Sequence, residues 1–196
     1  RTTTIYNPYT KGPVPENTRK SAETARQAVT VTPEAYQETV NIVSQAQQTE
    51  GQSFKGALRR SFMDVFKRTH KAQPIEVQGV TFNGEPYLVE IGNRAVSKVV
   101  SDGKASTEKL SLLQNIDQVV SNGEYVGSSE YAKGNLNKAQ NTIRYDYFET
   151  PVTVNGKEYI AAYDVEVLDE KKERHNFRTY KLNKIDLIPQ TGDGLV

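Results

Sequence analysis

The stretch from Ile143 to Ile185 constrains the fold most, because three strand patterns follow one another there with short connections between them. Apolar and polar residues alternate over three runs, Ile143–Thr153, Glu158–Leu168 and Phe177–Ile185. Asn155-Gly156 joins the first two runs and supports the positive φ angles of a tight hairpin turn. A charged loop over Asp169–Arg174 is expected before the third. These signals predict a three-stranded antiparallel meander.

Helix signals and one more hairpin precede the meander. Thr32-Pro33-Glu34 combines a hydroxyl cap with proline at the first helical position, and it predicts a helix that ends near Gln48. Apolar residues at helical spacing predict two further helices, Ser53–His70 and one that begins at Ser106 and stops at Ser121-Asn122-Gly123. Asn83-Gly84 predicts a β-hairpin turn between strands that start at Ile75 and Pro86.

The remaining segments are polar. Residues 1–16 read as a linker or extended arm, and Asn17–Thr30 as a short polar helix. Tyr125-Val126 predicts a short strand, and Gly127–Asn141 a mobile loop. We therefore expect an arm over residues 1–50 and, over residues 51–196, an α+β domain. Its N-terminal helices pack on a twisted antiparallel sheet made of a β-hairpin, a helix and a three-stranded meander.

Composition excludes several kinds of site. The chain has no cysteine, so disulfides, thiolate metal sites and cysteine nucleophiles are absent. It has two histidines, His70 and His175, too few for a multi-histidine zinc site. Asp164, Glu166 and the acids that follow them are explained by a solvated strand and turn, and we expect no metal and no cofactor. No run approaches the ~18 apolar residues of a membrane span, so no membrane partner is expected.

Positive charge is concentrated in residues 51–104, although the whole chain has a formal charge of only +1. A basic helix face and the hydroxyl-rich stretch that starts at Asn93 could face a phosphate backbone, or they could be ordinary solvated surfaces. Backbone N–H groups at the helix start near Ser106 would favour an anion. The RNA-binding candidates are Arg59, Arg60, Arg94, Ser101, Lys104 and Ser106.

Local motifs do not define an activity. Phosphate-binding loops, a dinucleotide fingerprint, a nucleophile elbow and metalloprotease motifs are missing from the sequence. His175 opens the last strand pattern, close to Arg178 and Tyr180, and could shuttle a proton, or it could be an exposed turn residue. His70 ends a helix, where a cation interacts favourably with the negative helix terminus. Tyrosines on the meander suit half-buried strands and would also stack on RNA bases.

Five segments carry a family resemblance, and they lie in order between about residues 52 and 187: FKGALRRSFMDVFKR, a strand pair ending in NRAVSKVVS, EKLSLLQNIDQVVSNGEYV, IRYDYFETPVTVNGKEYIAAYDVEV and FRTYKLNKI. This arrangement resembles phage and mobile-element polyvalent-protein domains of the barnase/EndoU/colicin/RelE-like (BECR) nuclease superfamily. The resemblance implies a toxin fold that cleaves RNA without metal, in which the 2′-hydroxyl attacks the adjacent phosphate.

The catalytic candidates that the resemblance implies are Lys98, Lys109, Tyr147, Arg178 and Tyr180, and these should converge on one cleft. Related domains commonly place a histidine near the turn that is Ser101-Asp102-Gly103 here, and this chain has none. The general base is therefore His175, or a tyrosine or lysine with a perturbed pKa, or the domain does not cleave RNA.

The leading hypothesis from the sequence is a C-terminal toxin domain of a phage-associated protein, secreted or injected as part of a longer chain and acting on RNA in the target-cell cytoplasm. RNA and a cognate immunity protein are its expected partners. The alternative is a non-catalytic interaction module of a phage or mobile-element protein. A nucleotidyl or ADP-ribosyl transferase has little support, because the arginine, STS and ExE pattern does not occur in the required order.

Overall fold

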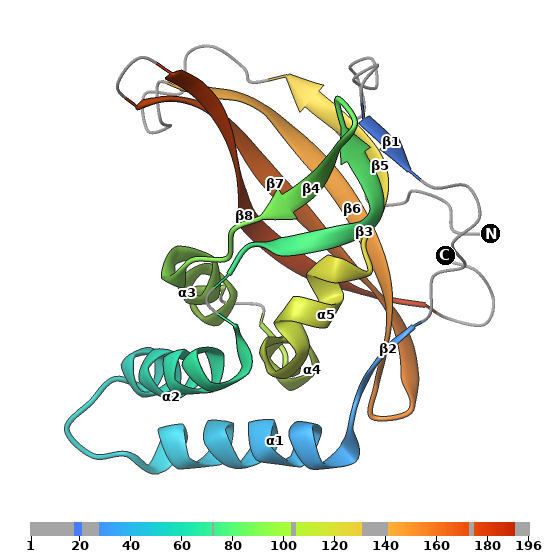
Figure 1. The fold of residues 1–196 in the computed structure, drawn as a ribbon. Coiled ribbons are helices and arrows are strands. Elements are labelled where there is room, and N and C mark those ends of the chain that lie inside the picture. The colour runs from blue at the N-terminus through green and yellow to red at the C-terminus, as the bar shows by residue number, and fades with distance from the viewer. Residues whose placement is uncertain are drawn as a thin grey trace.

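The computed structural model describes residues 18–20, 28–71, 73–102, 105–130, 141–172 and 175–190, and it confirms an α+β fold (Figure 1). The predicted arm over residues 1–16, Lys104 and the end of the chain after residue 190 lie outside the described residues. Helices and a β-hairpin cover one face of a sheet of long, curved strands.

The predicted meander is confirmed as β6 (Thr142–Val154), β7 (Lys157–Lys172) and β8 (His175–Pro189). Asn155 and Gly156 form the first turn with φ of 51° and 75°. The charged loop expected over Asp169–Arg174 is wrong over most of its length, because β7 continues to Lys172 and Asp169 pairs with Arg178 on β8. Charged residues with weak strand preference are held there by an uninterrupted ladder, which outweighs local propensity.

Two short strands extend the meander into a five-stranded sheet. The order is β2-β6-β7-β8, and β5 (Glu124–Glu130) pairs with the first half of β6. β2 (Val29–Val31) runs parallel to the end of β6. The predicted helix over Asn17–Thr30 is therefore wrong at both ends, since β1 (Thr18–Lys20) is also a strand. Residues 21–27 of it lie outside the described residues. The loop predicted from Gly127 is wrong up to Glu130, and its residues 131–140 are likewise not described.

The predicted hairpin is confirmed as β3 (Ile75–Phe82) and β4 (Glu85–Val89), with Asn83 and Gly84 at φ of 52° and 78°. β1 adds to β3 as a third strand. Two backbone hydrogen bonds then attach the end of β4 to the edge of β8. The Glu90 N–H donates to the Tyr180 carbonyl at 2.8 Å, and the Leu182 N–H donates to the Glu90 carbonyl at 2.9 Å.

Hydroxyl caps begin the predicted helices α1 (Pro33–Gln48) and α2 (Phe54–Thr69), where Thr32 and Ser53 accept hydrogen bonds from Ala35 N and Gly56 N. The third predicted helix is divided into α4 (Thr107–Ser111), a 3₁₀ turn η1 (Leu112–Asn115) and α5 (Ile116–Ser121).

Helix α3 (Asn93–Ser101) is not anticipated by the sequence reading. Its cap is Gly92, which offers no side-chain signal, and its buried residues are mostly β-branched valines that favour strands. The four buried positions Ala95, Val96, Val99 and Val100 nevertheless follow helical spacing. Tertiary packing against the sheet and α2 decides the conformation here.

Aromatic rings form the centre of the core between the sheet and its covering layer. Phe148 stacks on Tyr163 with centroids 5.0 Å apart, and Tyr87 from the hairpin lies 5.3 Å from Phe148. Val31 and Ala46 belong to the same core, although both precede the domain boundary predicted at residue 50. No helix in the described part of the chain is long and apolar enough to span a membrane.

Gly123 provides a test of this core. The Tyr163 hydroxyl donates a 2.6 Å hydrogen bond to the Val120 carbonyl, and a Cβ at residue 123 would lie 2.1 Å from the same hydroxyl. Gly123→Ala should therefore lower the free energy of unfolding by about 2 kcal/mol, because the buried Tyr163 ring would have to move. Gly92→Ala is the matched control, since a Cβ there meets nothing within 4 Å. Equal urea midpoints for the two variants would contradict this packing.

Candidate functional site

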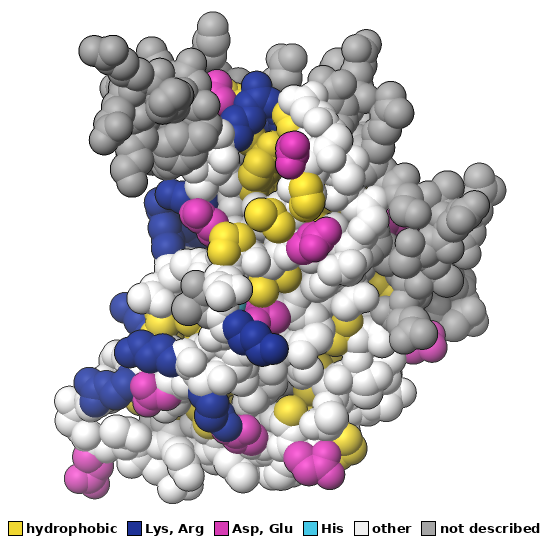
Figure 2. Space-filling model, in the orientation of Figure 1, with side chains coloured by type: hydrophobic (Ala, Val, Ile, Leu, Met, Phe, Trp, Pro, Cys, Tyr) yellow, Lys and Arg dark blue, Asp and Glu magenta, His cyan; other side chains and the backbone are white. Residues whose placement is uncertain are grey.

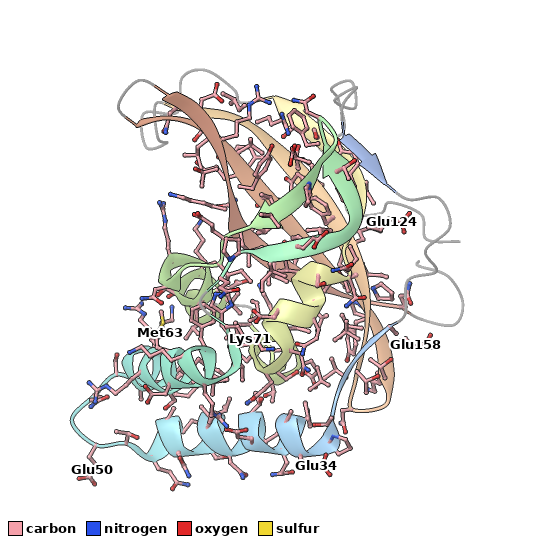
Figure 3. All side chains as sticks on the ribbon, in the orientation of Figure 1. Glu34, Glu50, Met63, Lys71, Glu124 and Glu158 are labelled. Atoms are coloured by element: carbon pink, nitrogen blue, oxygen red, sulfur yellow. The ribbon has the colours of Figure 1, made fainter. Side chains whose placement is uncertain are left out.

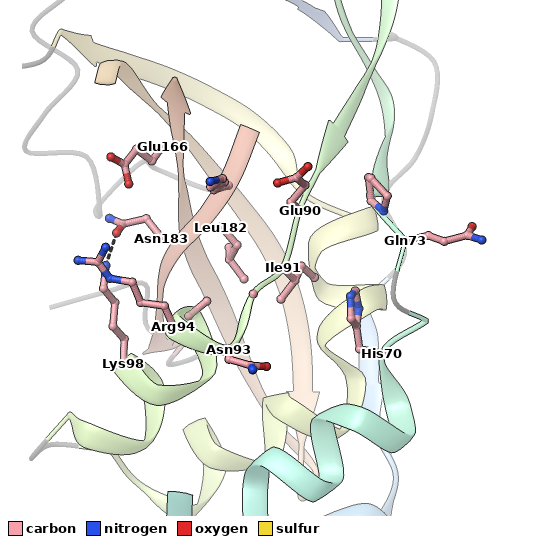
Figure 4. A pocket seen from close by; sticks show the side chains of 14 residues that line it. His70, Gln73, Glu90, Ile91, Asn93, Arg94, Lys98, Glu166, Leu182 and Asn183 are labelled. Atoms are coloured by element: carbon pink, nitrogen blue, oxygen red, sulfur yellow. Dashed lines mark hydrogen bonds between the residues drawn. The ribbon is translucent and has the colours of Figure 1, made fainter. Parts of the chain in front are cut away.

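A pocket of about 560 Å³ lies where α3, β8 and the end of α2 meet (Figure 4). Arg94 and Lys98 on α3 and Lys181 on β8 line one side of the pocket, and His70 lines another. Glu90 and Glu166 are the acidic residues of the lining. Cations therefore outnumber carboxylates in this pocket.

Asn183 fixes Lys98 at the edge of the pocket. β8 contains a bulge here, because Asp164 pairs with Lys184 while Val165 pairs with Leu182, so Asn183 is the extra residue. The Lys98 ammonium donates a hydrogen bond to Asn183 Oδ1, drawn as a dashed line in Figure 4. Asn183 thus leaves the regular β7–β8 ladder at the bulge, and its side chain positions Lys98.

Asp164 lies behind this contact and is only 3% exposed. Burial raises the pKa of its carboxyl, while a hydrogen bond from the Asn183 side chain and the charges of Lys184 and Lys98 lower it. The Asn183 amide therefore has a carboxylate on one side and an ammonium on the other. Its two ends are oriented by these opposite charges.

The N-terminus of α3 opens into the same pocket. Gly92, Asn93, Arg94 and Ala95 line it, and Gly92 provides no side-chain cap for the first N–H groups. Such N–H groups and the positive end of the helix dipole favour anions. The sequence reading placed the anion at the start of α4 instead, but Ser106 caps that helix by accepting a hydrogen bond from Lys109 N at 3.1 Å.

His70 is a site residue that the sequence reading did not select. Its Nδ1 lies 2.6 Å from Asp117 Oδ1, and its ring stacks on Phe66 with centroids 4.7 Å apart. Asp117 also accepts a 3.2 Å hydrogen bond from the Lys71 N–H. With Nδ1 donating to Asp117, Nε2 remains as the acceptor in a ring held from two sides. Asp117 lies 47 residues from His70, and nothing in the sequence connects them.

Lys98 and Lys109 are the two predicted catalytic residues that the structure brings together, since both line a smaller cavity of about 380 Å³ beside the first pocket. The Lys109 ammonium is 2.5 Å from Asp102 and 3.4 Å from Asp186, with a side chain only 8% exposed. Two carboxylates therefore neutralise Lys109, whereas Lys98 and Asn183 line both cavities.

Arg178 and Tyr180 lie elsewhere, beside the β3–β4 hairpin. The Arg144 and Arg178 guanidiniums lie 4.7 and 5.2 Å from the centre of the Phe82 ring, and Tyr180 is 4.5 Å from Tyr87 between ring centroids. The Arg178 and Tyr180 side chains therefore both contact the hairpin. Burial raises the pKa of Tyr180, so its hydroxyl stays protonated at neutral pH and the phenolate is not available as a base.

A buried carboxylate fixes this second cluster. Asp146 accepts hydrogen bonds from Tyr87 at 2.6 Å and Ser128 at 2.5 Å, and Arg144 donates to both of its oxygens at 2.8 and 3.2 Å. Tyr147, on the opposite side of β6, is within 2.7 Å of the Ser129 hydroxyl. The predicted catalytic residues therefore fall in three places rather than one cleft.

The other predicted site residues are distributed as follows. Arg94 lines the larger pocket. Arg59 donates a 3.1 Å hydrogen bond to Ser101 Oγ, and Arg60 is exposed on α2. His175 begins β8, and its side chain is not described. Lys104 lies outside the described residues. In the described part of the chain, no group of three His, Asp or Glu residues could hold a metal ion.

Together, these elements form an α+β domain with a pocket that is lined by three cations and by a histidine paired with an aspartate. The sequence profile of the large polyvalent protein-associated domain 3 family matches residues 55–180, which is more than half of the chain, and the chain belongs to this family. The match begins in α2 and ends within β8, so it includes most of the residues that line the pocket but not Lys181, Leu182 and Asn183. Comparisons with curated proteins and with solved structures give no match.

Glu149 gives a pH-dependent test of the sheet that supports the site. It is 6% exposed, and burial, followed by repulsion from Glu124 on the adjacent strand, raises the pKa of its carboxyl. An acid with a raised folded-state pKa stabilises the fold below its ordinary value of 4.5 and loses that contribution as pH rises. Glu149→Gln should therefore raise the free energy of unfolding at pH 7.5 by about 1 kcal/mol, and the gain should vanish near pH 4.

The matched control for this measurement is Glu158→Gln, because Glu158 is exposed on the neighbouring strand β7 (Figure 3). Its substitution should leave the unfolding midpoint within experimental error at both pH values. A destabilised Glu149→Gln protein at pH 7.5 would show that the carboxylate makes favourable contacts that outweigh its burial.

Proposed function

We propose that this domain is a metal-independent ribonuclease of a phage-associated polyvalent protein, and that the larger pocket binds the scissile phosphodiester. The observation that carries this proposal is the position of His70. Its ring is held by Asp117 and lines the same pocket as three cations and the uncapped start of α3. The sequence resemblance to ribonuclease toxins supports the same chemistry.

In this mechanism His70 Nε2 removes the proton of a 2′-hydroxyl. The 2′-oxygen then attacks the neighbouring phosphorus, the bond from phosphorus to the 5′-oxygen breaks, and the leaving 5′-oxygen takes a proton from solvent. The products are a 2′,3′-cyclic phosphate and a 5′-hydroxyl, and His70 releases its proton to solvent.

Charge that develops on the phosphate oxygens would be stabilised by Arg94, Lys98 and Lys181 and by the N–H groups at the start of α3. Lys98 is suited to this role, because Asn183 holds its ammonium at the edge of the pocket. Asp117 acts as a positioning residue, since it fixes the His70 ring without contacting the substrate.

The two histidines of the chain give a matched test. His70→Gln should reduce RNA cleavage by about 10²-fold or more, because the base would be lost, and His175→Gln should leave it unchanged. Cleavage by the unmodified protein should persist in EDTA, and the cyclic phosphate should appear in mass spectra of the products. Thermal unfolding of both variants controls for loss of the fold.

Asp117→Asn and Lys98→Met separate positioning from charge. Asp117→Asn should slow cleavage by about tenfold or more, because the His70 ring would lose the contact that orients it. Lys98→Met should slow cleavage by a similar factor through loss of a positive charge, while the His70–Asp117 contact stays intact. Loss of activity in His175→Gln but not in His70→Gln would place the base outside this pocket. A folded protein that cleaves no RNA but retains a protein partner in pull-down would favour the non-catalytic interaction module instead.

A further inference from the structure

The face of α3 that starts in the larger pocket leads directly onto α2. Arg94, Lys98 and Ser101 follow one another at intervals of four and three residues, so they lie along one side of this helix. Seven residues of helix rise by roughly 10 Å, which carries the line from the pocket to the C-terminal end of α3. There Arg59 of α2 donates its 3.1 Å hydrogen bond to Ser101.

On α2 the line continues in both directions. Lys55, Arg59, Met63 and Lys67 are spaced four residues apart and therefore form one row along the helix surface. All three cations of the row are exposed. Figure 3 places Met63 on the side of α2 that faces α3, and Figure 2 shows Lys and Arg side chains gathered over this edge of the molecule.

The opposite side of α2 has a different character. Arg68 points towards α1, where it forms a 2.6 Å ion pair with Glu38. Asp102, the acid at the end of α3, is held at 2.5 Å by Lys109. The line from the pocket to α2 thus carries positive charge, and the carboxylates of Asp102 and Glu38 are each paired with another cation.

We infer that the substrate is a polynucleotide strand several nucleotides long. The scissile phosphate would lie in the pocket, and the flanking phosphates would lie along the basic row formed by Arg94, Lys98, Arg59, Lys55 and Lys67. This inference rests on the proposed function for the cleavage step, but the phosphate-binding row makes a separate prediction. Each phosphate contact of a single strand contributes about −0.7 to the slope of log affinity against log salt concentration.

The binding experiment uses a 12-nucleotide single-stranded DNA, which lacks the 2′-hydroxyl and cannot be cleaved by this mechanism. Fluorescence anisotropy between 50 and 200 mM salt should show weaker binding by Lys55→Ala/Arg59→Ala protein. Its slope should be shallower by about 1.4, twice the value for one contact. Arg68→Ala is the matched control on the same helix and should leave the slope unchanged. Thermal unfolding verifies that each variant is folded.

The cleavage experiment compares a dinucleotide with a 12-nucleotide RNA. Lys55→Ala/Arg59→Ala should lower kcat/KM for the longer RNA by about tenfold or more and leave it unchanged for the dinucleotide, which reaches only the pocket. Unchanged binding slope and unchanged kcat/KM would overturn the basic row while the pocket mechanism stands. A shallower slope without cleavage of either RNA would support the row and reject the proposed ribonuclease. Absence of DNA binding would overturn the row.

Discussion

The outer edge of β8 is the constraint on which the rest of the structure depends. β7 pairs with β6 on one side and with β8 on the other along almost its whole length, so the second side of β8 is left without a meander partner. An unpaired strand edge exposes backbone donors and acceptors and invites aggregation. The chain covers this edge with two backbone hydrogen bonds, one donated and one accepted by Glu90, with helix α3 and with the bulge at Asn183. The pocket lies at this covered edge.

The larger pocket and the Asp146 cluster differ in how their buried charges are satisfied. Asp146 is fully buried, and three side chains donate hydrogen bonds to its two oxygens. A carboxylate satisfied in this way rigidifies a core, because a missing partner would leave a buried charge uncompensated. Asp164 is comparably buried but acts through Asn183, whose amide also contacts Lys98 at the pocket. The hydrogen bonds of Asp146 are made to neighbouring side chains in the core. The contacts of Asp164 continue through Asn183 to Lys98, which lines the pocket.

Sequence reasoning captured the elements whose local signals agree with their tertiary environment. The capped helices α1 and α2, the Asn-Gly turns and the alternating meander strands are of this kind, because a cap, a positive φ or a period of two is encoded within a few residues. The sequence analysis was wrong where tertiary packing, rather than local signals, determines the secondary structure. The valines of α3 favour a strand locally and become helical between the sheet and α2, and the charged end of β7 is strand because β8 pairs with it.

The same distinction explains what could be predicted of the site. Arg94 was selected because positive charge is visible in a sequence, and Lys98 was implied by the family resemblance. Both line one pocket because both lie on α3. The His70–Asp117 pair was missed because a hydrogen bond between residues far apart in the chain depends on how the end of α2 packs beside α5. A histidine at a helix end is explained locally by its favourable interaction with the negative end of the helix. His70 becomes a candidate site residue only once the structure shows its contact with Asp117 and its position in the pocket. In the proposed mechanism the general base sought near Ser101-Asp102-Gly103 comes from the end of α2 instead, and the basic α3 would hold the phosphate beside it.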